Sequence, residues 1–287
     1  MKYLLIGLVA VVALLSLAAC NAATVLNTLT SSASFDRERE IAYGELPRQT
    51  LDIYRAVEPR ESAPVLVFVH GGGWEDGDKK LYKFIGESFA REGYDVVVPN
   101  YRLHPESVYP DPVTDTALAA AWTVEAFGRP VVLMGHSAGG YNVLQTVFAK
   151  AISEGQGLDV CTNVAGVVAL APPTGAYELK EEPYISVFPG RFLGDDAPLN
   201  RAKAGEVEVP RILFIHGDAD TTVGPKNSTE LGTILGPRAQ VALYEGRGHI
   251  DVVRLLAGMF EDDSSIKATV LAFLEGLPEG GFCEAPA

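Results

Sequence analysis

The fold is decided by the stretch Val131-Val132-Leu133-Met134-Gly135-His136-Ser137-Ala138-Gly139-Gly140. Its first four residues are apolar, as in a short buried strand, and a run compatible with a helix follows from Tyr141 to Lys150. Between them lies Gly-x-Ser-x-Gly, the pattern of a sharp strand-to-helix turn with a nucleophilic serine at its corner. Such a corner strains the backbone and brings its flanks close together, which Gly135 and Gly139 permit because they carry no Cβ. We therefore expect Ser137 to be the nucleophile and the Ala138 N–H to face the substrate carbonyl oxygen.

This motif is short, and a simple glycine-rich turn is the alternative interpretation, so the rest of the chain has to decide. The 287 residues carry a formal net charge of −14, and 47% of them are hydrophobic. A single α/β domain of this length is common. The negative charge argues against a nucleic-acid partner, because binding nucleic acid requires a basic surface.

The N-terminus has the composition of a targeting segment. Lys2 precedes an apolar run from Leu4 to Leu17, which is too short to span a bilayer comfortably. The run ends in Leu17-Ala18-Ala19-Cys20, which resembles the lipobox of bacterial lipoproteins, in which the cysteine is diacylated. We therefore expect a signal peptide over residues 1–19, then lipidated Cys20 and a flexible tether over residues 20–38.

This interpretation predicts an exported protein of the bacterial cell envelope, periplasmic or on the outer surface, held to a membrane by its N-terminal lipids. An ordinary signal peptide cleaved after Ala19 or Ala23 is the alternative.

Two cysteines remain in the mature chain, Cys161 and Cys283. An even pair in an exported protein permits a disulfide. Closing so long a loop would stabilise the fold by up to ~4.7 kcal/mol on the chain-entropy model. Two unpaired thiols are the alternative.

Short apolar runs alternate with amphipathic segments along the chain, which predicts a mainly parallel sheet with helices between the strands. The expected strands are 51–54 (as an edge strand), 65–69, 95–98, 131–134, 167–170, 212–215 and 241–244. The expected helices are 80–91, 111–124 (capped by Asp111, with Pro112 in its first turn), 141–150 and a last one beginning near Ser264 or Ser265. In such sheets ligands bind beyond the C-terminal strand ends.

The segment 171–210 breaks this alternation. It is rich in proline and glycine, with aromatic residues between them. We interpret it as an insertion that folds over the strand ends and the active site. A surface loop with no role at the site is the alternative. Four aromatic residues are candidates to line the substrate pocket: Trp74, Tyr141, Tyr177 and Phe188.

Glycines follow the strand at 65–69 directly, in His70-Gly71-Gly72-Gly73-Trp74. Acyl transfer places negative charge on the former carbonyl oxygen, and backbone N–H groups aimed at that oxygen stabilise it. Gly72 and Gly73 are the expected donors, together with Ala138.

The remaining catalytic candidates also follow strands. His249 comes shortly after the strand at 241–244, and both Asp218 and Asp220 follow the strand at 212–215. The imidazole of His249 would take the Ser137 proton and return it to the leaving group, and a carboxylate would hold its other nitrogen. From position alone either aspartate could be that carboxylate.

The other histidines have different expected roles. His70 and His216 end strands beside glycines and are expected to brace loops by hydrogen bonds, His136 is expected to pack beneath the serine turn, and His104 has no evident partner. No His or Cys pair has the spacing of metal ligands, and neither a metal nor a cofactor is expected.

Taken together, these motifs resemble the α/β-hydrolases of the carboxylesterase and lipase kind. The resemblance covers residues 40–277. Its marks are Tyr43-Gly44, Gln49-x-Leu51-Asp52-Ile53-Tyr54, His70-Gly-Gly-Gly-Trp74 with Gly77-Asp78-Lys79, Asn100-Tyr101-Arg102-Leu103, Gly135-His-Ser-Ala-Gly-Gly140 and His216-Gly-x-x-Asp220-x-x-Val223.

The resemblance implies a catalytic domain over residues 39–280 with a sheet of about eight strands and helices on both faces. It also implies a Ser137–His249–Asp220 triad, since the last motif assigns the acid to Asp220. The hormone-sensitive-lipase branch carries a helical cap before its first strands, and the short mature segment upstream here leaves no room for a large N-terminal cap. A fairly open site for short or medium acyl groups is therefore expected.

The expected activity is hydrolysis of small-molecule carboxylic esters through an acyl-enzyme. Some relatives with the His-Gly-Gly-x-Trp motif are aryl formamidases, and others resemble feruloyl or acetyl-xylan esterases. An aryl amidase or formamidase with the same triad is the first alternative. A catalytically silent hydrolase fold used for binding is the second.

Overall fold

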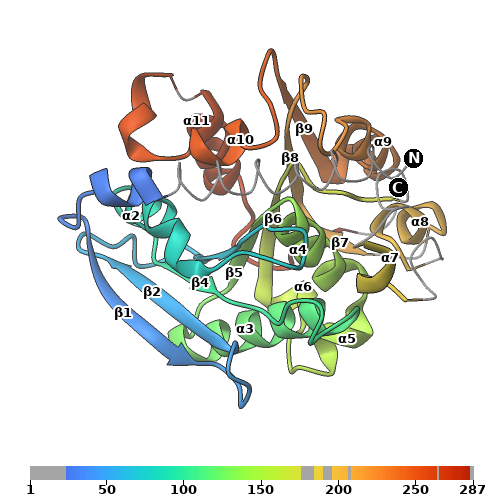
Figure 1. Ribbon diagram of the computed structural model, residues 1–287, viewed down its shortest axis with the longest axis horizontal. Coiled ribbons are helices and arrows are strands. Elements are labelled where there is room, and N and C mark those ends of the chain that lie inside the picture. The colour runs from blue at the N-terminus through green and yellow to red at the C-terminus, as the bar shows by residue number, and fades with distance from the viewer. Residues whose placement is uncertain (1–23, 176–183, 190–195, 206–207, 264, 285–287) are drawn as a thin grey trace, which may run out of the picture.

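The computed structural model describes residues 24–175, 184–189, 196–205, 208–263 and 265–284. An eight-stranded sheet forms its centre, in the order β1-β2-β4-β3-β5-β6-β8-β9 (Figure 1). Its strands are β1 (Phe35–Ala42), β2 (Thr50–Ala56), β3 (Val65–Val69), β4 (Val96–Pro99), β5 (Val131–His136), β6 (Val164–Leu170), β8 (Ile212–Gly217) and β9 (Ala239–Tyr244). β1 and β2 pair antiparallel with their neighbours, and the strands from β4 to β9 are parallel. The expected mainly parallel sheet of about eight strands is confirmed.

Helices connect these strands. They are η1 (Lys79–Tyr82), α2 (Lys83–Ala90), α3 (Asp111–Phe127), α4 (Ala138–Phe148), α5 (Lys150–Glu154), α6 (Val160–Asn163), α7 (Tyr184–Val187), α8 (Pro198–Lys203), α9 (Lys226–Leu235), η2 (Gly236–Arg238), α10 (Asp251–Arg254), η3 (Gly258–Asp263) and α11 (Ser265–Glu275). The helix expected at 141–150 begins earlier, at the serine turn itself, and breaks before Lys150.

The two faces of the sheet each carry a core because successive strand residues point to opposite sides. In β3, Val65, Val67 and Val69 join the core covered by α3, α4 and α9. Leu66 and Phe68 join the core covered by α2, α10 and α11. Figure 1 shows α10 and α11 above the sheet and α3 below it. The continuous apolar runs of the sequence are therefore strands buried on both faces.

The strand expected at 51–54 is not the edge of the sheet, because β1 pairs outside β2. The alternation of apolar and polar residues in 51–54 predicted an edge strand, but its polar residue, Asp52, is buried. Asp52 is fully buried and lies 2.7 Å from Lys79 Nζ and 2.6 Å from Arg37 Nη2. A buried carboxylate with two cationic partners is paired rather than solvated, which the sequence pattern does not reveal.

The segment expected as a tether, 20–38, is structured where the structure describes it. Residues 24–29 are helical, and β1 begins at Phe35. Leu26 is buried, and Asn27 Oδ1 accepts a hydrogen bond from Phe84 N at 3.2 Å, in the first turn of α2. Asn27 thus satisfies an amide that α2 leaves open, because Tyr82 makes no capping bond with its side chain. Residues 1–23, with the expected signal peptide and Cys20, lie outside the described residues.

Of the helices within the described ranges, none is both long and apolar enough to cross a lipid bilayer.

The N-terminus of α3 differs from the expected capping arrangement. Asp111 is the first helical residue rather than the cap, and Pro110 precedes it. Its carboxylate lies 3.1 Å from Arg102 Nη1. The Asp111 carboxylate is therefore paired with Arg102, and no side chain among the described residues caps α3.

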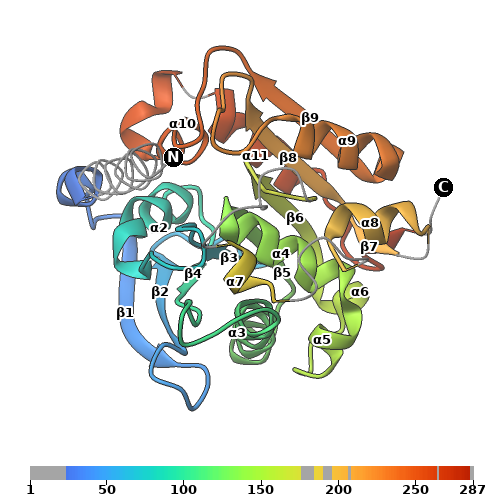
Figure 2. The same ribbon diagram turned by 45° about the vertical axis from the view of Figure 1, so that its right-hand side comes forward.

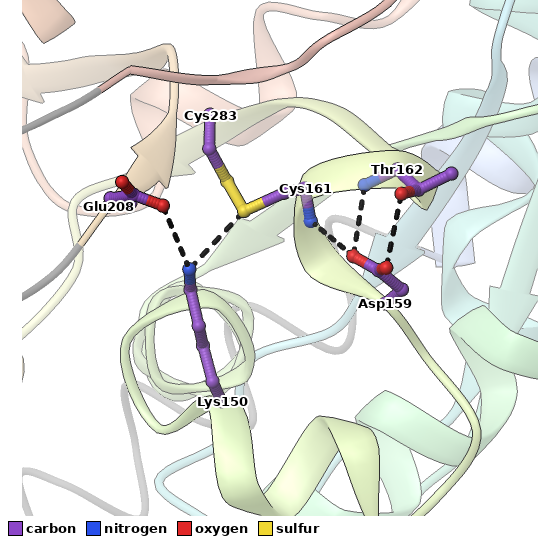
Figure 3. The surroundings of a disulfide bond; sticks show 6 residues. All are labelled: Lys150, Asp159, Cys161, Thr162, Glu208 and Cys283. Atoms are coloured by element: carbon purple, nitrogen blue, oxygen red, sulfur yellow. Dashed lines mark hydrogen bonds and ion pairs between the residues drawn. A yellow bond between two sulfur atoms is a disulfide. The ribbon is translucent and has the colours of Figure 1, made fainter.

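The C-terminal end of the described chain is held by a disulfide between Cys161 and Cys283, one of the two alternatives that the sequence left open (Figure 3). Cys283 belongs to β10 (Cys283–Glu284), which pairs with β7 (Val209–Pro210) in a second, two-stranded sheet. Asp159 caps α6 by accepting from Cys161 N at 3.0 Å, and Lys150 Nζ lies 3.2 Å from Cys161 Sγ. Cys283 and β10 thus lie beyond residue 280, the expected end of the catalytic domain.

Two histidines at strand ends are buried in the neutral form. Burial lowers the pKa of His70 to about 4. Burial and the neighbouring His249 lower the pKa of His136 to about 3. In the unfolded chain both imidazoles would titrate near their ordinary value of about 6.5.

We predict that these histidines make the protein sensitive to acid. As the pH falls below about 6.5, His70 and His136 become protonated in the unfolded chain but stay neutral in the native protein. Each histidine therefore lowers the free energy of unfolding by about 1.4 kcal/mol per pH unit. Urea unfolding of His136→Gln at pH 6, 5 and 4 should show a pH slope shallower than that of the wild type by about this amount. Equal slopes for the two proteins would contradict the prediction.

Candidate active site

The serine turn has the strained geometry that its sequence predicts. Ser137 joins β5 to α4 with φ 54° and ψ −120°, a conformation that non-glycine residues rarely adopt. Its amide donates to Leu170 O at 2.9 Å, and its carbonyl accepts from Tyr141 N at 3.0 Å. These two bonds fix the corner from the sheet on one side and from the helix on the other.

The glycines of the motif are required by close backbone contacts. A Cβ on Gly135 would lie 2.3 Å from Gly139 O, and one on Gly139 would lie 2.2 Å from Val69 O. Either contact is far below van der Waals distance. The first turn of α4 can therefore approach the ends of β3 and β5 only because these residues have no side chain.

The structure joins His249 to Asp220. His249 Nδ1 lies 2.7 Å from Asp220 Oδ2, and Asp220 Oδ1 accepts from Thr222 N at 2.8 Å and Val223 N at 2.9 Å. Asp218 is exposed and accepts from Gly246 N instead. Of the two aspartates that position alone allowed, Asp220 is the one bonded to His249.

Asp220 is held as a carboxylate by its surroundings. Burial raises its pKa, but hydrogen bonds from His216, His249 and the Val223 amide outweigh burial and bring the pKa well below its usual range. His216 Nε2 lies 2.8 Å from Val223 O and 3.3 Å from Asp220 Oδ2, and its Nδ1 lies 2.7 Å from Ser228 Oγ. His216 therefore braces the loop that carries the acid.

His136 links the histidine loop to the serine turn. Its Nε2 lies 2.9 Å from His249 O, and the two imidazole rings are 4.8 Å apart. His249 is thus packed against the residue that precedes Ser137. Ser137 Oγ makes no hydrogen bond with a described residue, so proton transfer between Ser137 and His249 stays a prediction.

The loop after β3 presents unpaired amides. Gly72 and Gly73 have φ of 122° and 62°, and their N–H groups donate to no acceptor among the described residues. A Cβ on Gly72 would lie 2.0 Å from Asp76 O, so this turn also requires glycine. Ala138 begins α4, where the first amides of a helix have no partner within it. The role of these three amides in an oxyanion hole stays a prediction.

Neighbouring loops hold the glycine loop in place, partly through Arg48, a residue that the sequence analysis did not single out. Arg48 Nε donates to Tyr101 O at 2.8 Å and its Nη2 donates to Gly77 O at 2.9 Å. His104 N donates to Trp74 O at 2.7 Å. The only available signal for Arg48 was its position beside Gln49 in a quoted motif.

The remaining histidines take the following places. His70 Nδ1 lies 2.8 Å from Gly71 O, and its ring stacks on Tyr101 at 4.4 Å. His104, for which no partner was evident, makes no hydrogen bond through Nδ1 among the described residues, and Glu75 Oε1 lies 3.5 Å from that atom. Within the described part of the chain, no group of three or more His, Cys, Asp or Glu residues could hold a metal ion.

Three of the four candidate pocket residues pack against one another. Phe188 lies 4.9 Å from Trp74 and 5.3 Å from Tyr141 between ring centroids, and all three side chains are buried. Trp74 Nε1 donates to Asn142 Oδ1 at 2.9 Å. Tyr177 lies outside the described residues. The assignment of these residues to a substrate pocket stays a prediction.

The chain is similar to several known hydrolases. It is 28% identical over 240 residues to a probable isoprenylcysteine alpha-carbonyl methylesterase of Oryza sativa subsp. japonica, covering 75% of this chain and 58% of the relative. The chain thus spans somewhat over half the length of this relative. It is 26% identical to a kynurenine formamidase of Drosophila melanogaster, covering 79% of this chain and 78% of the relative.

Solved structures share the fold. A crystal structure of inhibited esterase B from Lactobacillus rhamnosis superposes with a TM-score of 0.76 at 19% identity, covering 94% of this chain and 96% of that one. A truncated carbohydrate esterase from gut microbiota gives 0.70 at 18% identity, covering 86% and 98%. At this identity the likeness establishes the α/β-hydrolase fold alone.

The model of the BD-FAE family matches residues 51–235, which include β2 to α9 with the glycine loop, the serine turn and Asp220. Because this match covers well over half of the chain, the protein belongs to the BD-FAE family.

Proposed function

We propose that the protein is a serine hydrolase that cleaves small-molecule carboxylic esters with short or medium acyl groups. The observation that carries the proposal is the 2.7 Å pair of His249 and Asp220, packed beside a serine held at φ 54°. A buried carboxylate on one imidazole nitrogen leaves the other nitrogen as a base for the serine.

In the first half of the reaction, Ser137 Oγ attacks the ester carbonyl carbon as His249 Nε2 takes its proton. The N–H groups of Gly72, Gly73 and Ala138 bind the negative oxygen of the tetrahedral intermediate. When this intermediate collapses, the bond to the alcohol breaks and His249 gives its proton to the leaving alkoxide. The products are a free alcohol and an acyl group esterified to Ser137.

In the second half, a water molecule attacks the acyl carbon while His249 takes one of its protons. The second intermediate collapses, the bond to Ser137 breaks, and the proton returns to the serine. Asp220 stays ionised throughout and holds His249 in the tautomer with its proton on Nδ1. The low pKa of Asp220 suits this role, since a carboxylate that remains charged stabilises the imidazolium.

The relatives support ester hydrolysis and keep a second candidate open. The plant relative is named as a methylesterase, which favours esters with a small alcohol. The insect relative is named as a kynurenine formamidase and matches over similar shares of both chains. An aryl formamidase with the same triad is therefore the second candidate for this chain.

The proposed location is the bacterial cell envelope, with the chain anchored through lipids on Cys20. The sequence around Cys20 carries this proposal. The Cys161–Cys283 disulfide supports export, because disulfides persist mainly in oxidising compartments.

The triad makes a prediction with a matched control. Ser137→Ala should lower kcat for a short p-nitrophenyl ester on the order of 10⁶-fold, and Asp220→Asn on the order of 10⁴-fold. Asp218→Asn, on the same loop, should stay within about twofold of the wild type because Asp218 does not touch His249. Only the wild type and Asp218→Asn should react rapidly with a fluorophosphonate. Unchanged turnover by Ser137→Ala would refute the mechanism, and a wild type inert to both reagents would favour a silent binding protein.

The preference for an ester over an amide bond can be measured directly. We expect kcat/KM for a phenyl acetate to exceed that for the matched acetanilide and formanilide, because alkoxide and phenoxide leave more readily than an amine. Purified protein lacking residues 1–23 is the material for this comparison. Preference for the formanilide would assign the formamidase reaction instead.

The anchor is tested in the full-length chain. Expressed in a bacterium, the wild type should sediment with membranes and acquire mass from acyl chains, whereas Cys20→Ala should lose both properties. Cys161→Ala is the control for loss of a cysteine elsewhere and should remain with the membranes. A soluble, unacylated wild type would exclude lipidation.

A further inference from the structure

A tyrosine of the inserted segment lies against the glycine loop. If Gly73 carried a Cβ, the heavy atoms within 4 Å of it among the described residues would be Tyr184 Cε1 at 3.6 Å and Tyr184 Oη at 3.7 Å. The edge of the Tyr184 phenol therefore bounds the space beside Gly73, one of the proposed oxyanion donors. Glycine at 73 leaves this space free of protein.

Tyr184 is held there by packing. It is the first residue of α7, and its ring meets Trp74 edge-on, with centroids 6.1 Å apart and an interplanar angle of 84°. Three residues along the same helix, Val187 is fully buried and its carbonyl accepts from Tyr109 N at 2.8 Å. Phe188 follows and packs its ring on Trp74. Figure 2 brings α7 to the front of the molecule, where it is drawn across α4.

The Tyr184 hydroxyl is available as a donor. Two other tyrosines use their O–H groups within the protein: Tyr43 donates to Asn100 O at 2.6 Å and Tyr101 donates to His70 O at 3.1 Å. Tyr184 Oη has no hydrogen-bond partner among the described residues. Burial and the nearby charge of Glu75 raise the pKa of Tyr184, so the phenol keeps its proton at neutral pH. The Tyr184 hydroxyl is not among the buried polar atoms that lack a partner, so solvent or a ligand can reach it.

We propose that the Tyr184 hydroxyl is a further catalytic donor, which hydrogen-bonds the carbonyl oxygen of the bound ester beside the Gly73 amide and strengthens that bond as the oxygen becomes negative. The inference rests on the proposed ester hydrolysis and adds to it a side-chain donor, contributed by the insertion rather than by the sheet. A phenol suits this position because its O–H is a stronger donor than water and its ring is already fixed by Trp74.

The test is the removal of one oxygen atom. Tyr184→Phe keeps the ring and its packing, and it should lower kcat for acetyl, butyryl and hexanoyl p-nitrophenyl esters by at least about tenfold, with KM changed less than about twofold. The loss should be the same for all three esters, because the carbonyl oxygen is common to them. Thermal unfolding of the variant should match that of the wild type.

Two control variants isolate the hydroxyl. Tyr94→Phe makes the same chemical change just before β4, at the end of the strand opposite to the active site, and Ile185→Ala alters an exposed neighbour on α7. Both should keep wild-type kcat.

The outcomes separate this inference from the proposed function. A Tyr184→Phe variant with wild-type kcat on all three esters would overturn the inference and leave the triad standing. A loss confined to the longer esters would also overturn it, because it would indicate a wall for the acyl chain. A wild type without Ser137-dependent turnover would overturn both.

Discussion

The molecule depends on one close contact between backbone segments, where the first turn of α4 meets the ends of β3 and β5. The carbonyl oxygen of Val69 lies 2.2 Å from the position of a Cβ on Gly139, and that of Gly139 lies 2.3 Å from the position of a Cβ on Gly135. This contact holds Ser137 at φ 54°, a conformation that costs about 1–3 kcal/mol and persists only where its surroundings impose it. The bonds from Ser137 N to Leu170 O and from Tyr141 N to Ser137 O supply that constraint.

The parallel sheet then brings the chemistry to this corner. Because β3, β5, β8 and β9 run parallel, the segments that follow them emerge at one edge. The glycine loop follows β3, Asp220 follows β8 and His249 follows β9. His136, the last residue of β5, bonds to the backbone of His249, so the loop after β9 is tied to the strand that carries the serine. Asp220 is bonded to the same histidine from the loop after β8.

Buried polar groups around the site serve to hold loops rather than to react. His216 Nε2 lies 2.8 Å from Val223 O and 3.3 Å from Asp220 Oδ2, so its imidazole braces the loop that carries the acid. Arg48 joins two carbonyls from separate loops, and Asp52 pairs with Lys79 in the segment that follows the glycine loop. These donors stabilise the fold because a buried carbonyl or carboxylate without a hydrogen-bond partner would raise the free energy of the native state. Their effect is to hold the loops that follow the strands in place.

The sequence by itself determined the class of fold, the serine turn and the order of the candidate triad, because each depends on local requirements. A strand buried on both faces needs a continuous apolar run, and a corner such as Ser137 needs glycines beside it. The motif around Asp220 already favoured it over Asp218, and the structure shows Asp220 bonded to His249. Only the tertiary structure decided that β1 lies outside β2 and that Cys161 meets Cys283. It also placed Tyr184 over Gly73, although the two residues are far apart in the chain. These outcomes depend on contacts between segments that are distant in the chain. Such contacts are stabilised by side-chain packing and strand pairing, which cannot be seen in any short stretch of sequence.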